Sequence, residues 1–385
     1  MFALRPASTL QPVRILIGMP DPHSLGGPAT CEPPFVTELR GRGIDVLEEI
    51  YVSGTPLEGI TFSERVRRVL RTARTFRSLL SHHQFDIVHL NTSFDLNAML
   101  RDIVCINAMR RRTKVLFLKM HGSDPSIFVS RNPVIRLLRW AILSRVDAVG
   151  VLSTEERARM LEIGVPAEKV SVVKNVVELS TFSASSTGAT DRSLSRPTLL
   201  FIARMVPTKG LLHVVRACRI LQSQGRKFAL VCVGDGPARK EAELEARSLG
   251  IESIHFTGQI SEAQAAQHYL RSTMLVFPTH HGEGFSLTIF KAVAAGLPVL
   301  TTRIRAAADY LSEPENCLWI RPFDPEGLAS RITELLDEPL RLAAMRENNL
   351  VLGRQFSSPK VTSEYIQLYE TLVRRHSPEA IGSVT

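Results

Sequence analysis

The stretch His281-Gly-Glu-Gly-Phe-Ser-Leu-Thr-Ile-Phe-Lys-Ala-Val-Ala-Ala-Gly-Leu-Pro-Val-Leu300 joins a glycine-flanked turn to a helix and then to a strand. The run Met274-Leu-Val-Phe-Pro278 before it has the apolar character of a buried strand. Leu287 to Ala295 is predicted to be the helix, and Gly296-Leu-Pro298 is predicted to end it before a strand at Val299 to Thr301. Strand, turn, helix and strand in this order indicate a parallel α/β sheet.

The start of this helix is a predicted anion site. The backbone N–H groups of Gly284, Phe285, Ser286 and Leu287 come at the helix N-terminus, where they lack intrahelical acceptors. Such donors attract phosphate groups, with support from the helix dipole. Glu283 adds one carboxylate directly before the turn. We therefore expect a phosphorylated ligand at this place.

The first half of the chain alternates short apolar strands with helical segments. The predicted strands are Val13 to Gly18, Asp45 to Leu47, Asp86 to Leu90, Lys114 to Leu118, Ala148 to Leu152 and Val170 to Val173. The first strand leads into Gly26-Gly27 and then into a helix predicted at Phe35 to Arg42, because Pro33-Pro34 is expected to delay the helix. Buried strands that alternate with helices are typical of a doubly wound, mainly parallel sheet.

A polar segment rich in Ser and Thr, residues 180–196, is predicted to separate two domains. After it the alternation resumes, with predicted strands at Thr198 to Ala203, Ala229 to Val233, Ile254 to Phe256, Met274 to Phe277 and Val299 to Thr301, and a last helix at Glu364 to Arg375. The predicted boundaries are 1–179 for the first domain, 180–196 for the linker, 197–361 for the second domain and 362–385 for a closing helix and tail. The sequence therefore predicts two Rossmann-like α/β domains.

The composition of the 385 residues is that of a globular protein, with 44% hydrophobic and 22% charged residues. No apolar run approaches the roughly 20 residues of a membrane-spanning helix, and residues 1–12 lack the apolar core of a signal peptide. The five cysteines lie far apart without a zinc-binding spacing, so we expect packing residues in a reducing compartment rather than a nucleophile. These features favour a cytoplasmic location, with peripheral attachment to the inner face of the plasma membrane as one option.

The net charge of +9 is concentrated in the first half of the chain. Between Arg65 and Phe85 there are six arginines, two histidines and no acidic residue. Apolar residues at helical spacing share this segment, which predicts a basic amphipathic helix. Such a helix is either a solvated surface or a contact for an anionic membrane, at about 1 kcal/mol per basic residue. Nucleic acid is not expected as a partner, because no binding module accompanies the charge.

Two cations follow the first strand of the second half. Arg204 and Lys209 lie in the turn after Thr198 to Ala203, at the carboxyl end of a predicted parallel strand, where ligands bind in such sheets. The pair suits a diphosphate, although an Arg and a Lys at this spacing are more often surface charges. In the first half, His121 also follows a buried strand, and a lone histidine there is more often structural.

The stretch from Glu283 resembles the signature of the family-four retaining glycosyltransferases, in which a Glu-Gly-Phe-Gly turn is followed by a second Glu. Glu283 matches the first Glu, and Lys291, eight residues on, stands at the position of the second. Ala203-Arg-Met-Val-Pro-Thr-Lys-Gly210 is similar to the family's Gly-Arg-Leu-x-x-x-Lys-Gly element. The resemblance extends from Val13 to about Leu372 and implies the GT-B fold, an α/β arrangement of two Rossmann-like, doubly wound domains facing a central cleft.

The resemblance also implies roles for individual residues. Arg204 and Lys209 are implied to hold the diphosphate of a nucleotide sugar, and Glu283 to accept hydrogen bonds from hydroxyl groups of its sugar. His121 matches a histidine near the transferred sugar and the acceptor, and Gly27 resembles part of a loop that closes over the donor phosphate. Lys291 would stand where the family's second Glu accepts hydrogen bonds from the ribose, although an ammonium group has no acceptor.

The reaction implied by the resemblance is front-face sugar transfer with retention, in which the departing phosphate oxygen takes the proton of the acceptor. The acceptor is expected to be a glycan or a lipid-linked glycan in cell-surface polysaccharide or glycolipid synthesis. No Asp-x-Asp motif or histidine cluster indicates a metal, so neither a metal nor a cofactor is expected besides the nucleotide-sugar donor. Because of Lys291, a catalytically degenerate GT-B protein that acts as a binding or scaffolding subunit is the alternative. Two further alternatives are a transferase with an altered choice of donor and a nucleotide-sugar epimerase.

Overall fold

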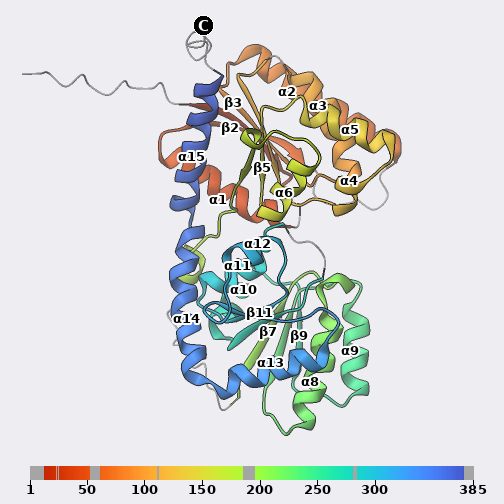
Figure 1. Ribbon diagram of the computed structural model, residues 1–385, viewed down its shortest axis with the longest axis vertical. Coiled ribbons are helices and arrows are strands. Elements are labelled where there is room, and N and C mark those ends of the chain that lie inside the picture. The colour runs from red at the N-terminus through yellow and green to blue at the C-terminus, as the bar shows by residue number, and fades with distance from the viewer. Residues whose placement is uncertain are drawn as a thin grey trace, which may run out of the picture. The chain divides into compact units, whose positions relative to one another are not determined.

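The computed structural model describes residues 13–22, 24, 26–52, 61–110, 112–184, 196–280 and 284–376. The chain divides into two compact units. Unit 1 comprises Met1–Val173 and Val361–Thr385, and unit 2 comprises Lys174–Lys360. Each unit is built on a six-stranded parallel sheet with helices around it (Figure 1).

The sheet of unit 1 has the strand order β2-β1-β3-β4-β5-β6. Its strands are β1 (Arg14–Pro20), β2 (Asp45–Val52), β3 (Ile87–Thr92), β4 (Val115–Met120), β5 (Ala148–Val151) and β6 (Val170–Val172). Every residue of β3 and β4 is buried, which explains their continuous apolar character in the sequence. From β1 the chain adds β2 on one side of the sheet and β3 on the other, so the strand order changes direction between β1 and β3. In doubly wound sheets, ligands bind at the carboxyl ends of the strands at this switch point.

Seven α-helices accompany this sheet in the described part of the chain. They are α1 (Gly27–Gly41), α2 (Phe62–His82), α3 (Leu96–Met109), α4 (Pro125–Val129), α5 (Pro133–Leu143), α6 (Thr154–Glu162) and α15 (Ser358–Arg375), with a short 3-10 turn η1 at Ala167–Lys169. The last helix, α15, packs through Tyr365 against Phe35 of α1 at a ring-centroid distance of 4.7 Å. Its Tyr369 lies 6.0 Å from Phe117 of β4. These aromatic contacts fix the end of the chain to unit 1.

The start of α1 differs from the sequence prediction. The helix begins at Gly27 and contains Pro33 and Pro34, so the prediction that these prolines delay the helix is wrong. Gly26, where the chain turns into the helix, has φ of 143°. A residue with a side chain would be strained in this backbone conformation, whereas glycine is not. Each internal proline costs roughly 3 kcal/mol in an isolated helix. Here the cost is offset by burial of one helix face, which includes Phe35.

The sheet of unit 2 has the strand order β12-β11-β10-β7-β8-β9. Its strands are β7 (Thr198–Ile202), β8 (Ala229–Val233), β9 (Ile254–Gly258), β10 (Met274–Phe277), β11 (Val299–Thr301) and β12 (Cys317–Trp319). Strand succession reverses between β7 and β10, so the carboxyl ends of these two strands are the expected ligand edge. The edge strand β12 is only three residues long, and the sequence analysis did not identify it.

The helices of unit 2 are α7 (Ser180–Ala184), α8 (Leu211–Ser223), α9 (Arg239–Ser248), α10 (Glu262–Arg271), α11 (Leu287–Ala294), α12 (Arg305–Tyr310), α13 (Pro325–Asp337) and α14 (Pro339–Gly353), with 3-10 turns η2 (Pro207–Lys209) and η3 (Arg354–Phe356). The short helix α7 lies inside the segment predicted as a linker. It packs against α10, where the rings of Phe182 and Tyr269 are 6.1 Å apart. Residues 185–195 of that segment lie outside the described part of the chain.

Candidate functional site

Arg204 and Lys209 lie at the predicted ligand edge of unit 2, directly after β7. Arg204 is exposed, whereas Lys209 is half-buried at the end of η2. The Lys209 Nζ lies 5.9 Å from the centre of the Phe277 ring, at the carboxyl end of β10. Burial and the neighbouring Arg204 guanidinium lower the pKa of Lys209 to about 8. The two cations therefore form a concentrated positive site between the ends of β7 and β10.

Close backbone contacts hold the loop of Arg204 and Lys209 in place. Gly234 follows β8 with φ of 119°, and a Cβ there would lie 2.0 Å from the Ala203 carbonyl oxygen. Gly210 has φ of 78°, and a Cβ there would lie 2.5 Å from the Pro278 carbonyl oxygen. The His280 N–H also donates a hydrogen bond of 3.0 Å to the Thr208 carbonyl of this loop. The two glycines let the segments after β7, β8 and β10 approach one another, which larger residues would prevent.

The helix predicted from the signature stretch is confirmed, because α11 begins at Leu287. Ser286 is its N-cap residue and makes no side-chain cap hydrogen bond, so the first N–H groups receive no acceptor from it. Phe285 is only 6% exposed and stacks on Phe290 with ring centroids 3.9 Å apart, which anchors the turn that contains Gly284. Glu283 lies outside the described residues, so its role stays a prediction.

Lys291 lies on α11 and forms an ion pair with Glu262 of α10. The Nζ and Oε2 atoms are 2.5 Å apart, and the Lys291 side chain is 15% exposed. The sequence analysis singled out Lys291 but not Glu262. No local pattern points to Glu262, since it lies at the start of a different helix and meets Lys291 only in the folded chain.

In unit 1, His121 follows β4 at the ligand edge of the sheet. Its Nε2 lies 2.7 Å from the Asn91 Oδ1 and 3.2 Å from the Glu32 Oε1. Glu32 in turn forms a buried ion pair of 2.7 Å with Lys119 of β4. Glu32 lies on α1, the helix that begins at Gly27. The sequence analysis predicted His121 and Gly27 but missed the buried charges beside His121, because a single Glu and a single Lys carry no recognisable spacing.

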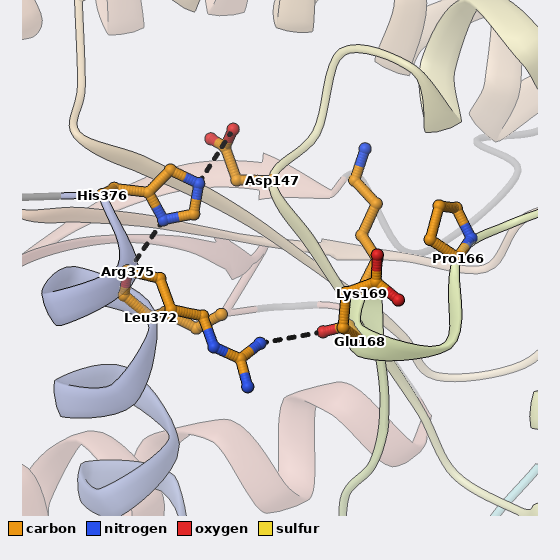
Figure 2. A pocket seen from close by; sticks show the side chains of 7 residues that line it. All are labelled: Asp147, Pro166, Glu168, Lys169, Leu372, Arg375 and His376. Atoms are coloured by element: carbon orange, nitrogen blue, oxygen red, sulfur yellow. Dashed lines mark hydrogen bonds and ion pairs between the residues drawn. The ribbon is translucent and has the colours of Figure 1, made fainter. Parts of the chain in front are cut away.

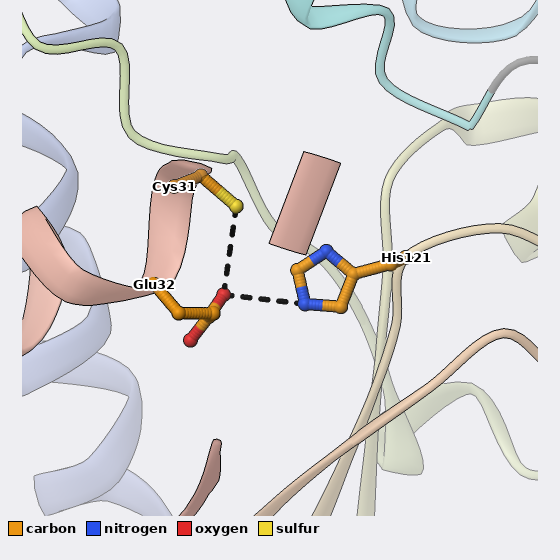
Figure 3. A group of neighbouring side chains, drawn as sticks. All are labelled: Cys31, Glu32 and His121. Atoms are coloured by element: carbon orange, nitrogen blue, oxygen red, sulfur yellow. Dashed lines mark hydrogen bonds and ion pairs between the residues drawn. The ribbon is translucent and has the colours of Figure 1, made fainter. Parts of the chain in front are cut away.

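Cys31, Glu32 and His121 lie close enough together to be considered as metal ligands (Figure 3). The Cys31 Sγ is 3.7 Å from the Glu32 Oε1, to which it donates. Burial, with the Glu32 carboxylate, raises the pKa of the Cys31 thiol far above its usual value, which disfavours the thiolate that a metal requires. The Lys119 ammonium already neutralises Glu32. A divalent cation bound to Glu32 would be repelled by this ammonium, so Cys31, Glu32 and His121 do not fit a metal site.

A pocket at the opposite edge of unit 1 contains both signs of charge (Figure 2). It is lined by Asp147, Pro166, Glu168, Lys169, Leu372, Arg375 and His376. Asp147 immediately precedes β5, so the pocket lies at the amino ends of the strands rather than at their carboxyl ends. Two of its polar contacts involve the end of the chain: the Arg375 guanidinium donates to the Glu168 carbonyl at 3.1 Å, and His376 Nε2 lies 3.7 Å from Asp147 Oδ1. These bonds attach the end of α15, and the pocket is not part of the candidate site.

Family models match most of the chain. Residues 34–181 match the model described as Glycosyltransferase Family 4, and residues 188–350 match the model described as Glycosyl transferases group 1. The chain belongs to the family-four glycosyltransferases. The second of these models contains Arg204, Lys209 and the whole signature stretch, and the first contains His121.

Individual glycosyltransferases are distant relatives of the chain. A D-inositol 3-phosphate glycosyltransferase from Thermobispora bispora is 26% identical over 72% of this chain and 68% of the relative. A phosphatidyl-myo-inositol mannosyltransferase from Propionibacterium freudenreichii is 22% identical over 82% of this chain and 80% of the relative. The chain is thus a glycosyltransferase by its family.

Solved glycosyltransferase structures share the fold. Sucrose-phosphate synthase from Thermosynechococcus elongatus superposes with a TM-score of 0.74 at 19% identity, covering 94% of this chain and 100% of the other. HepE from Anabaena, in complex with UDP and glucose, has a TM-score of 0.67 at 17% identity, covering 93% and 100%. The predicted α/β class with the GT-B fold is confirmed by these likenesses and by the two parallel sheets.

Proposed function

We propose that this glycosyltransferase moves a sugar from a nucleotide diphosphate sugar to a glycan or lipid-linked acceptor, with retention of the anomeric configuration and without a metal or cofactor. The observation that carries the proposal is the positive site between the ends of β7 and β10. Arg204 and Lys209 lie there in one loop, and the N-terminus of α11 follows β10. Two cations and unsatisfied helix N–H groups suit a diphosphate and stabilise the negative charge that develops as it departs.

The proposed roles follow from this arrangement and from the family signature. Arg204 and Lys209 hold the diphosphate, and the backbone of Gly284 to Leu287 adds N–H donors to it. Glu283 accepts hydrogen bonds from the donor sugar, and His121 contacts the reacting sugar in unit 1. Gly27 belongs to the loop beside the donor phosphate. The departing phosphate oxygen then takes the proton of the acceptor hydroxyl.

A scaffolding protein without transfer activity is the second candidate, favoured by one observation. Lys291 replaces the family's second Glu, and its ammonium is engaged by Glu262 at 2.5 Å. Loss of one hydrogen bond to a charged group costs roughly 1.5 to 3 kcal/mol. That loss weakens donor binding by about one to two decades, which still leaves transfer possible at high donor concentration. Retention of both diphosphate cations therefore favours the active enzyme.

We also propose that unit 1 contacts an anionic membrane at the inner face of the plasma membrane. Helices α2, α3 and α5 lie side by side on one face of its sheet (Figure 1). Six large apolar side chains on α3 and α5 are between 36% and 63% exposed: Leu96, Leu100, Val104, Val134, Leu137 and Trp140. We call these six residues the α3–α5 face. Exposed apolar residues with a Trp, next to basic residues, are typical of interfacial membrane contact.

The charge around the α3–α5 face supports a membrane rather than a protein partner. No acidic residue occurs between Asp124 and Asp147, whereas four arginines do. The neighbouring α2 carries six more arginines, and its only acidic residue is Glu64. Among the described residues, no helix combines the length and apolar character needed to cross a bilayer. The proposed attachment is therefore peripheral.

The central test combines donor binding with product analysis. Calorimetric titration with UDP, GDP and their sugars is expected to identify one donor. Arg204→Ala is expected to weaken its binding about 10- to 100-fold, because a charge-assisted hydrogen bond is removed. Arg219→Ala, at an exposed arginine of α8, is the matched control. With the donor known, proton NMR of the product shows whether the anomeric configuration is retained, and an inverted product would rule out the retaining mechanism. If none of the nucleotides or nucleotide sugars binds, the scaffolding role replaces the transferase.

A further inference from the structure

Three elements of unit 1 bring buried polar side chains around His121. Glu32 comes from α1 and is fully buried, and Asn91 comes from β3. Lys119 comes from β4, and His121 follows that strand directly. The Glu32 Oε1 lies 2.7 Å from the Lys119 Nζ and 3.2 Å from the His121 Nε2. The His121 Nε2 also lies 2.7 Å from the Asn91 Oδ1.

These partners determine which ring nitrogen of His121 carries the proton. Asn91 donates through its Nδ2 to the Gly18 carbonyl at 2.9 Å, so its Oδ1 faces His121 as an acceptor. Burial alone would raise the pKa of Glu32, but the Lys119 ammonium and the hydrogen bond from His121 outweigh burial and hold it well below its usual range. An ionised carboxylate can only accept. Both neighbours of Nε2 are therefore acceptors, and Nε2 must donate.

The other ring nitrogen is left with a lone pair. The His121 side chain is 6% exposed, and its buried Nδ1 has no hydrogen-bond partner among the described residues. Burial and the Lys119 ammonium lower the pKa of His121, so the ring is neutral near pH 7. A buried polar atom without a partner is uncommon in folded proteins, and a neutral imidazole nitrogen accepts hydrogen bonds well.

We infer that Glu32 is a positioning residue that holds His121 as the Nε2–H tautomer, so that Nδ1 accepts a hydrogen bond from a hydroxyl group of the sugar substrate. Asn91 supports the same tautomer, and Lys119 keeps Glu32 ionised. The inference rests on the proposed sugar transfer for the identity of the hydroxyl group. A ring fixed by outer partners needs no reorganisation when the substrate arrives, which is how such partners act at other catalytic histidines.

The tautomer can be measured without any substrate. The protein is labelled with ¹⁵N in its histidine rings, and the His121 signals are assigned by their loss in His121→Gln. The expected spectrum near pH 7 shows a protonated Nε2 and an unprotonated Nδ1. A protonated Nδ1 in the unmodified protein would overturn the inference, and this result requires no variant of Glu32 to fold.

The role of Glu32 is tested with Glu32→Gln/Lys119→Met, which removes both charges of the pair and keeps similar volumes. Its ring signals are expected to show a mixture of tautomers, with kcat reduced about 10-fold or more and the Kd for the nucleoside diphosphate, which lacks the sugar, unchanged. Tyr369→Phe is the matched control, because it removes the hydroxyl group 2.6 Å from the neighbouring buried His89 and leaves the Glu32 network intact. The control should keep both the His121 signals and kcat.

The outcomes separate this inference from the proposed function. An unchanged single tautomer in the double variant, or a mixture of tautomers with an unchanged kcat, would overturn the positioning role of Glu32. If the unmodified protein transfers no sugar, the proposed function fails. The ring signals of the double variant would then still decide whether Glu32 sets the His121 tautomer.

Discussion

The Lys291 ammonium and the Glu262 carboxylate lie 2.5 Å apart, although 29 residues separate them in the chain. By the resemblance to the family signature, Lys291 stands at the position of the second Glu, and Glu262 places an acidic residue of another helix against it. The negative group at this point of unit 2 thus comes from α10 rather than from α11. The ion pair has a consequence for stability.

Reversing the charge of Lys291 should destabilise the protein more than removing it. Lys291→Met loses an ion pair whose Glu262 side is 62% exposed, so the expected cost is at most about 1 kcal/mol. Lys291→Glu additionally places two carboxylates in contact, and Glu262→Lys/Lys291→Glu should restore most of the stability. Urea unfolding of the four proteins measures these differences. Equal stability of Lys291→Met and Lys291→Glu would show that the two side chains do not interact in solution.

Affinity for a nucleoside diphosphate should fall as the pH rises through about 8. Burial and the Arg204 guanidinium lower the pKa of Lys209 to about 8, so its ammonium is charged below this pH and neutral above it. In the proposed site the charged form holds the diphosphate, so affinity is expected to be highest on the acidic side. Arg204→Ala removes one cause of the lowered pKa, so the fall should move to higher pH while overall affinity drops. Calorimetric Kd values between about pH 7 and pH 9 test this, and a flat profile would contradict a role for the Lys209 charge.

Gly234→Ala should disrupt the donor site far more than Gly43→Ala. Both glycines have positive φ, 119° and 78°, so alanine is strained at either position by about 1 to 2 kcal/mol. Only at Gly234 would the new Cβ also lie 2.0 Å from the Ala203 carbonyl oxygen, and nothing lies within 4 Å at Gly43. We expect a further loss of about 1 to 3 kcal/mol at Gly234, together with weaker donor binding. Thermal unfolding and donor titration of the two variants provide the comparison.

The α3–α5 face should bind anionic vesicles through its apolar side chains. Leu137 and Trp140 are 61% and 63% exposed, and each loses its apolar contact with lipid when replaced by glutamine. Leu137→Gln/Trp140→Gln is expected to reduce co-sedimentation with phosphatidylglycerol vesicles at least about 10-fold. Leu340→Gln, which removes an 89% exposed leucine of unit 2, is the control for loss of an exposed apolar residue. Equal vesicle binding by the unmodified protein and the double variant would remove this face as the membrane contact.

Local sequence patterns were sufficient to predict most of the architecture. The apolar runs of β3, β4 and β10 are short and bounded by glycine, proline or polar residues, so strand and turn were readable without knowledge of the neighbours. The same holds for the start of α11 and for the position of Arg204 and Lys209 after β7. The three residues of β12 were too few to form a pattern. The course of α1 was mispredicted because the local cost of Pro33 and Pro34 is outweighed by burial that a local pattern does not contain.

The charged groups that surround the candidate residues depended on long-range packing. Glu32 and Lys119 are 87 residues apart in the chain and meet because α1 packs on the sheet to which β4 belongs. Their mutual attraction is what keeps both charges stable in a buried place, and neither residue has a distinctive sequence context. The resemblance to the family signature supplied His121, Arg204, Lys209 and Lys291 as candidates, because each matches a position in a short motif of the sequence. The partners of His121 and Lys291 came from the fold, since a hydrogen bond depends on distance in space and not on separation along the chain.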